Sequence, residues 1–128
     1  RRIQATTFDQ TIPAKDSRRQ IPFLSNSNVS YFAALDANET APQMFLSGDD
    51  NWLVGGQDRG DGVAINGLTV KPGVLSLWTN TPVAWSEARH QKQGNVGLAD
   101  GSVQGFSSSK LAEALRNSGV ATNRLVFP

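Results

Sequence analysis

Short apolar runs separated by turn residues make up most of this chain, and this pattern predicts a small, mainly antiparallel β-sheet. The runs are rich in aromatic and β-branched residues, which strands favour, and each is short enough to be one buried strand. We predict strands within residues 29–35, 43–47, 74–78 and 83–85. The turn composition of residues 36–42 predicts that the first two pair antiparallel.

Residues 63–86 have the composition of a meander of short strands. Asn66-Gly67 is typical of a tight hairpin turn, and Pro72-Gly73 fits the central pair of a type II turn. Further strands are therefore expected at residues 63–65 and 68–70. The final apolar run, within residues 120–128, is consistent with one more strand or with a strap over the core.

A second hairpin is predicted around Asp100-Gly101, a dipeptide typical of two-residue turns with positive φ at both positions. If these two residues are the loop, Leu98 faces Val103. Facing residues share one side of the ribbon, so Val96, Leu98 and Val103 would form one apolar face directed at the core.

One helix is predicted, over residues 107–119. Serines at its start offer an N-cap, Leu111 and Leu115 lie one turn apart, and Gly119 is a stop signal. Residues 1–28 have neither helical nor strand periodicity, and prolines interrupt them. They are expected to form an irregular lead-in with room for one short strand. Together these elements predict an α+β fold: a small antiparallel sheet with a short C-terminal helix.

Composition restricts the possible functions. A chain of 128 residues with 38% hydrophobic content is the size of one domain with a real core. Its net charge of +1 provides no general attraction for nucleic acid. It has no cysteine, which excludes disulfides, thiolate metal sites and thiol nucleophiles.

An acidic, glycine-rich loop is expected at residues 48–62. It contains four carboxylates that are candidate ligands for a hard cation such as calcium: Asp49, Asp50, Asp58 and Asp61. Their spacing does not match an EF-hand loop. A calcium site and a solvated turn region are both compatible with this composition.

The three tryptophans have two possible roles, packing in the core or stacking on a sugar ring or a base. Trp78 and Trp85 lie in strand-like runs with aliphatic neighbours, which favours packing. Trp52 lies in the acidic loop, and this makes it the better candidate for an exposed binding contact.

Catalysis is not expected. The sequence lacks a nucleophile elbow, a phosphate-binding glycine loop and a metal-binding His-Glu-x-x-His helix. The only histidine, His90, lies close to Glu87, which suggests metal or acid-base chemistry. However, five strand residues at about 3.3 Å each place Asp100 about 16 Å from Asn95, so His90 and Asp100 are not expected to share a site. We expect His90 to fix its loop by hydrogen bonds to the backbone, and Asp100 to be a turn residue.

A motif in the same region resembles that of a known family. His90 is followed by nine residues and then Asp100-Gly101, with Gly94 and Asn95 in between. This pattern resembles the C-terminal motif of a group of bacterial prepilin-like proteins related to type II secretion pseudopilins. Two other stretches resemble members of that group, residues 31–40 and 123–125.

The resemblance implies a structural subunit: the soluble head of a pilin-like protein. In that family a membrane-embedded N-terminal helix, processed by a prepilin peptidase, joins subunits and anchors them in the inner membrane, with the head in the periplasm or outside the cell. No run of about 20 apolar residues is present here, so the anchor is expected to be encoded upstream of Arg1. The alternative is a cell-envelope binding module for calcium at the acidic loop or carbohydrate at Trp52. No other cofactor is expected.

Overall fold

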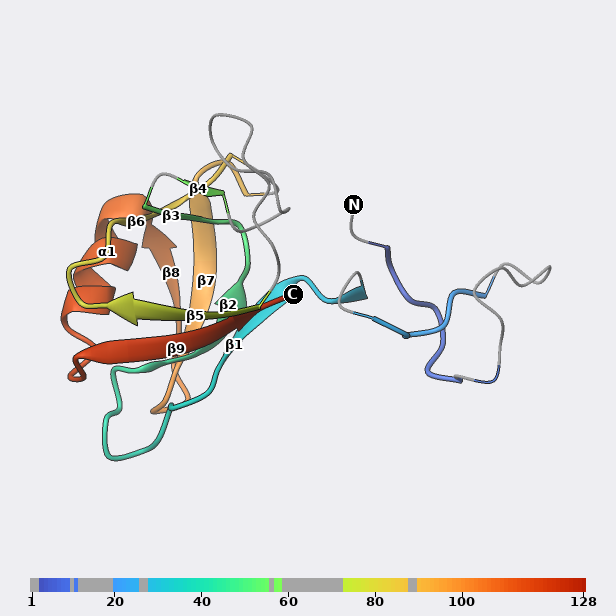
Figure 1. Cartoon of the computed structure of the whole chain (residues 1–128), viewed down its shortest axis with the longest axis horizontal. Coiled ribbons are helices and arrows are strands. Elements are labelled where there is room, and N and C mark those ends of the chain that lie inside the picture. Colours follow the sequence, from blue (N-terminus) through green and yellow to red (C-terminus); the bar gives the residue numbers. More distant parts are fainter. Residues whose placement is uncertain are drawn as a thin grey trace. The chain divides into compact units, whose positions relative to one another are not determined.

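A computed structural model describes residues 3–9, 11, 20–25, 28–55, 57–58, 73–87 and 90–128. The chain divides into two compact units, Arg1–Ser30 and Tyr31–Pro128, which are described separately (Figure 1). The first unit is described over residues 3–9, 11, 20–25 and 28–30. A parallel bridge joins Thr7 to Pro22, and the rings of Phe8 and Phe23 lie 5.6 Å apart.

The second unit is a mostly antiparallel β-sheet domain with one short helix among its described residues, a small α+β fold. Its elements are β1 (Tyr31–Ala34), β2 (Phe45–Asp49), β3 (Trp52–Val54), β4 (Gln57–Asp58), β5 (Gly73–Trp78), β6 (Val83–Trp85), β7 (Gln93–Leu98), β8 (Val103–Ser107), α1 (Ser108–Arg116) and β9 (Thr122–Phe127). The described helix has nine residues, far fewer than the roughly 20 that a membrane-spanning helix needs.

Two sheets contain these strands. The larger has the order β5-β9-β1-β2-β7-β8 and the smaller has the order β4-β3-β6. The predicted antiparallel pairing of the first two strands is confirmed, and the C-terminal run is a strand between β5 and β1. The predicted meander is wrong for β5 and β6, because β5 pairs with β9 and β6 pairs with β3. The strands expected at 63–65 and 68–70, with Asn66-Gly67 and Pro72, lie outside the described residues.

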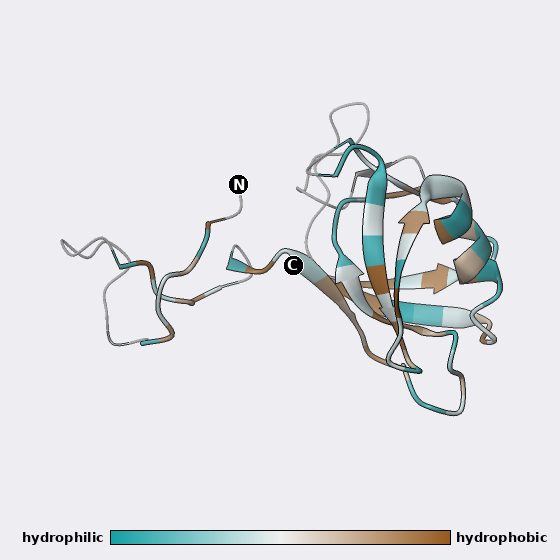
Figure 2. Cartoon of the chain, turned by 180° about the vertical axis from the view of Figure 1, so that it is seen from behind, coloured by the Kyte–Doolittle hydropathy of each residue, from teal (hydrophilic) through white to brown (hydrophobic). Residues whose placement is uncertain are grey.

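The hydrophobic core lies between one face of the larger sheet, the smaller sheet and α1. Alternate residues of the strands point inward, and Figure 2 shows this alternation as bands of hydrophilic and hydrophobic colour. The largest fully buried side chains of the core are Trp52, Trp85, Phe32, Phe45, Leu77, Leu98, Leu111, Leu115 and Leu125.

The predicted helix is confirmed, although it is shorter than expected. The Ser107 hydroxyl accepts a hydrogen bond from the Lys110 N–H at 3.4 Å, which makes Ser107 the N-cap. Leu111 and Leu115 are both buried. The helix ends at Arg116, and Gly119 then adopts a φ of 81° in the turn toward β9.

The β7–β8 hairpin has a different turn from the one predicted. Leu98 donates its N–H to the Ser102 carbonyl at 2.8 Å, and Gly101 donates to the Leu98 carbonyl at 3.0 Å. Positive φ occurs at Gly101 (85°) but not at Asp100. The loop is therefore a three-residue type, a type I turn followed by a left-handed glycine. The Asp100 carboxylate favours it by accepting the Ser102 N–H at 2.8 Å.

This turn moves the pairing by one residue, so Gly97 and not Leu98 lies opposite Val103. Because side chains alternate between faces, Val103 leaves the predicted apolar face and is 73% exposed. Phe106, opposite Gly94, takes its place in the core beside Val96 and Leu98.

An ion pair between Asp36 and Arg124 gives the domain a predictable acid sensitivity. The hydrogen-bonded guanidinium lowers the pKa of Asp36 below its usual 3.8. A carboxyl whose pKa is lower in the folded state than in the unfolded state stabilises the fold when the pH is above the unfolded-state pKa, here about 3.8. This stabilisation is lost as the pH falls through the folded-state pKa.

We expect Asp36→Asn to lower the melting temperature slightly at pH 6, and this difference to shrink as the pH falls below 3.8. Thermal unfolding followed by circular dichroism over this range measures it. In an Arg124→Gln background the same substitution should have no pH-dependent effect. A constant difference at every pH would show that the ion pair is not its source.

Candidate functional site

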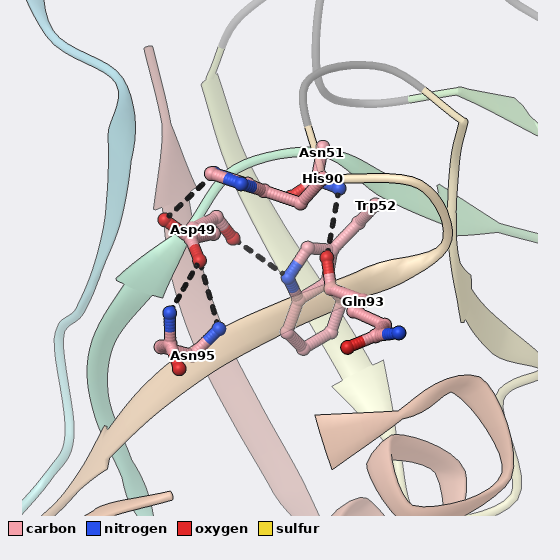
Figure 3. Close-up of polar contacts among 6 residues, drawn as sticks. All are labelled: Asp49, Asn51, Trp52, His90, Gln93 and Asn95. Carbon is pink, nitrogen blue, oxygen red and sulfur yellow. Dashed lines mark hydrogen bonds and ion pairs between the residues drawn. The ribbon is translucent and has the colours of Figure 1, made fainter. Parts of the chain in front are cut away.

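Asp49, at the end of β2, is the centre of a polar cluster of six residues (Figure 3). Its carboxylate Oδ2 accepts the Asn95 backbone N–H at 2.8 Å and lies 3.4 Å from the Asn95 side-chain amide. Its carbonyl oxygen accepts the indole N–H of Trp52 at 2.9 Å. The Asp49 side chain is only 11% exposed, so these contacts hold a nearly buried carboxylate in one orientation.

His90 lies beside the other carboxylate oxygen. Its Nε2 is 3.6 Å from Asp49 Oδ1, too far for a hydrogen bond but close enough for an ion pair when the imidazole is protonated. The side chain is 47% exposed. The His90 main-chain carbonyl accepts the Gln93 N–H at 3.1 Å, while the imidazole, expected to bond to the backbone, faces Asp49.

A buried asparagine fixes the loop that carries His90. The Asn51 side-chain amide donates to the Gln93 carbonyl at 3.2 Å, and its backbone carbonyl accepts the Ser86 N–H at 2.7 Å. Gln91 and Lys92 have φ values of 49° and 64°, so the chain turns sharply just after His90. These contacts direct the His90 side chain toward Asp49.

The motif residues separate into two groups. His90 and Asn95 both contact Asp49, whereas Asp100 and Gly101 form the turn at the other end of β7. With about 3.3 Å per residue, six-residue β7 places this turn about 20 Å from the loop that carries His90. As expected, His90 and Asp100 do not share a site.

Gly94 has a packing role that the sequence did not reveal. A Cβ atom at this position would lie 2.6 Å from the six-membered ring of Trp85, closer than carbon atoms approach in folded proteins. Glycine is therefore required where β7 crosses the buried indole. The Gly-Asn pair supports the fold on both faces of β7, because Gly94 admits Trp85 and Asn95 binds Asp49.

The expected acidic loop is wrong for residues 48–49, 52–54 and 57–58, which belong to β2, β3 and β4. Asp49 and Asp50 are both buried. The side chain of Asp58 and all of Asp61 lie outside the described residues. Among the described residues, no three acidic or histidine side chains group together as a metal site would require.

The tryptophan assignments are reversed for two of the three residues. Trp52 is fully buried, whereas Trp78 is 60% exposed. Trp52 begins β3, and its pairing opposite Trp85 directs both rings into the core. Trp78 is an outward residue at the end of edge strand β5. Trp85 is buried, as predicted.

Comparison with known proteins finds no matching family model, no similar curated protein and no similar solved structure.

The carboxylate of Asp49 should contribute measurably to stability. In Asp49→Ala the Asn95 N–H loses its acceptor, and we expect a loss of about 1–3 kcal/mol in the free energy of unfolding. Asp49→Asn retains an acceptor oxygen and should lose less. Urea unfolding followed by circular dichroism compares the two variants. Equal losses would show that charge, rather than the acceptor to Asn95, accounts for the contribution.

Proposed function

We propose that this chain is a structural subunit, the head of a membrane-anchored pilin-like protein related to type II secretion pseudopilins. Its head would lie in the periplasm or outside a bacterial cell. An anchor helix encoded upstream of Arg1 would hold it at the inner membrane and join it to other pilin-like subunits. In this proposal the chain has no catalytic role and no nucleic-acid partner.

The proposal is supported by the structural roles of the motif residues. Gly94 admits the Trp85 ring, Asn95 holds Asp49, and Gly101 adopts the positive φ of the hairpin turn. Each of these residues stabilises the sheet or its hairpin turn. A motif of this kind is expected in a protein whose function is to present a stable surface.

The encoded residues upstream of Arg1 test the proposal directly. We expect a stretch of about 20 apolar residues there, preceded by a prepilin-peptidase processing site. The full gene product, expressed in a bacterium with that peptidase, should be cleaved and should fractionate with the inner membrane. A matched variant without the apolar stretch should be released from the membrane.

An upstream sequence with no apolar stretch would contradict the proposal. A full gene product that the peptidase does not process, and that does not fractionate with membranes, would do the same.

A further inference from the structure

The face of the larger sheet opposite the core carries an open groove of about 520 Å³. Its lining comes from four strands, with Tyr31 from β1, Ser47 from β2, Gly97 from β7 and Val103 from β8. Ser47 and Gly97 pair across the middle of the groove, and both are small. The groove is therefore shallowly filled between Tyr31 and Val103.

Two glycines lie on this face without a steric need for glycine from the described residues: Gly97 in the groove, and Gly105 beside it, opposite Asn95. Gly97 and Gly105 lie in extended strands without positive φ. A Cβ atom at Gly97 would be 3.6 Å from the nearest atom and one at Gly105 would be 3.5 Å away, both ordinary contacts. At inward-facing Gly48, by contrast, a Cβ would lie 2.5 Å from the Asn95 carbonyl oxygen.

Glycine in a strand destabilises it and often marks close approach by a ligand or another backbone. Since no part of the described domain requires glycine at 97 or 105, a group from outside is the better explanation. The groove also has apolar sides. Tyr31 is 61% exposed and Val103 is 73% exposed, and both line it. An apolar side chain of a partner would bury both.

One end of the groove carries a carboxyl group. Asp49, His90 and Asn95 line this end, and among the described lining residues there is no lysine or arginine. Asp49 Oδ2 is engaged by Asn95, while the described ion-pair neighbour of Oδ1 is a half-exposed histidine at 3.6 Å. A cationic group entering from the groove would find a nearly buried carboxylate oriented to receive it.

We propose that this groove binds a segment of a partner polypeptide that places an apolar side chain over Gly97 and Gly105 and a lysine or arginine against Asp49. The two glycines let the partner backbone approach the sheet, and Tyr31 and Val103 enclose its apolar side chain. This inference does not depend on the pilin-like role, since any partner with this pattern would satisfy it.

Three synthetic peptides test the proposal with the whole chain labelled with nitrogen-15. They are acetyl-Ala-Leu-Ala-Arg-Ala-amide, whose Leu and Arg share one side of an extended chain, the same peptide with Glu in place of Arg, and the same peptide with Ser in place of Leu. Amide chemical shifts are followed at peptide concentrations up to about 10 mM, the range for weak complexes of short peptides. We expect saturable shifts at Gly97, Gly105 and Asn95 with the first peptide, and at least tenfold weaker binding of the other two.

Matched variants locate the binding. Gly97→Leu fills the groove from an outward position and should weaken binding at least tenfold. Ser76→Leu adds the same side chain to an exposed position of β5 on the same face and should have no effect. In Asp49→Asn the preference for the Arg peptide over the Glu peptide should disappear, with the fold verified by its amide spectrum.

The proposal is overturned if the three peptides bind equally, if none shifts the groove amides, or if Gly97→Leu binds the Arg peptide as well as the unmodified chain does.

Discussion

Replacing Gly94 by alanine will lower the melting temperature of this protein by about 10 °C, whereas the same change at Gly97 will leave it unchanged or slightly higher. The two glycines lie on opposite faces of β7. A methyl group at Gly94 would overlap the buried Trp85 ring, with a separation of 2.6 Å. Forcing extra volume into a packed core costs about 1–3 kcal/mol, and each kcal/mol corresponds to about 5 °C for a domain of this size.

Gly97→Ala is the matched control, because its methyl group would make only ordinary contacts on the outer face. Removing a strand glycine there should stabilise the chain by up to about 1 kcal/mol. Thermal unfolding by circular dichroism measures both variants. Equal effects at the two positions, of either sign, would mean that contact with Trp85 is not the reason for glycine at residue 94.

The largest single loss is expected for Trp52→Ala. The Trp52 ring centroid lies 5.2 Å from Phe32, 5.6 Å from Trp85 and 5.7 Å from Phe127. The side chain is fully buried, and its indole N–H is bound to the Asp49 carbonyl. Truncating a buried tryptophan costs about 3–5 kcal/mol, a large fraction of the 5–15 kcal/mol that typically stabilises a domain.

Trp78→Ala is the control, since that side chain is 60% exposed and its loss should change the free energy of unfolding by less than about 1 kcal/mol. Urea unfolding should be followed by far-ultraviolet circular dichroism, because tryptophan fluorescence changes with either substitution. Trp52→Phe should give an intermediate loss. A greater loss from Trp78→Ala than from Trp52→Ala would contradict the assignment of the core.

Several elements of the fold are predictable from sequence because their signals are local. The helix has its N-cap serine, its leucine spacing and its terminal glycine within one short segment. The strands at Tyr31–Ala34 and Gly73–Trp78 come from dense apolar runs. In each case the residues that determine the element belong to the element itself.

The hairpin register was not predictable in the same way. Asp100-Gly101 is compatible with a two-residue and a three-residue loop, and the choice depends on which face of β8 is buried. Burial of Phe106 excludes Val103 from the core, and that outcome depends on α1 and the smaller sheet. The apolar pattern of Val96, Leu98 and Val103 does not indicate whether Val103 or Phe106 is buried in the core.

The polar cluster and the role of Trp52 also depend on long-range pairing. Asp49 and His90 are brought together by the antiparallel pairing of β2 with β7 and by the turn that precedes β7. Trp52 is buried because β3 pairs with β6. The acidic residues near Trp52 favour a loop in the sequence, so that strand was not predicted. The glycine at residue 94 is explained only by the ring above it, which comes from β6.

The position of β9 has a consequence for how the chain folds. This strand follows the other described strands in sequence, yet it lies between β5 and β1 and completes both pairings. Until it has been synthesised, β1 and β5 each have an open edge able to join other unfinished chains. The sheet must therefore close late and in one cooperative step, and a chain truncated before Thr122 should aggregate rather than form a smaller version of the same sheet.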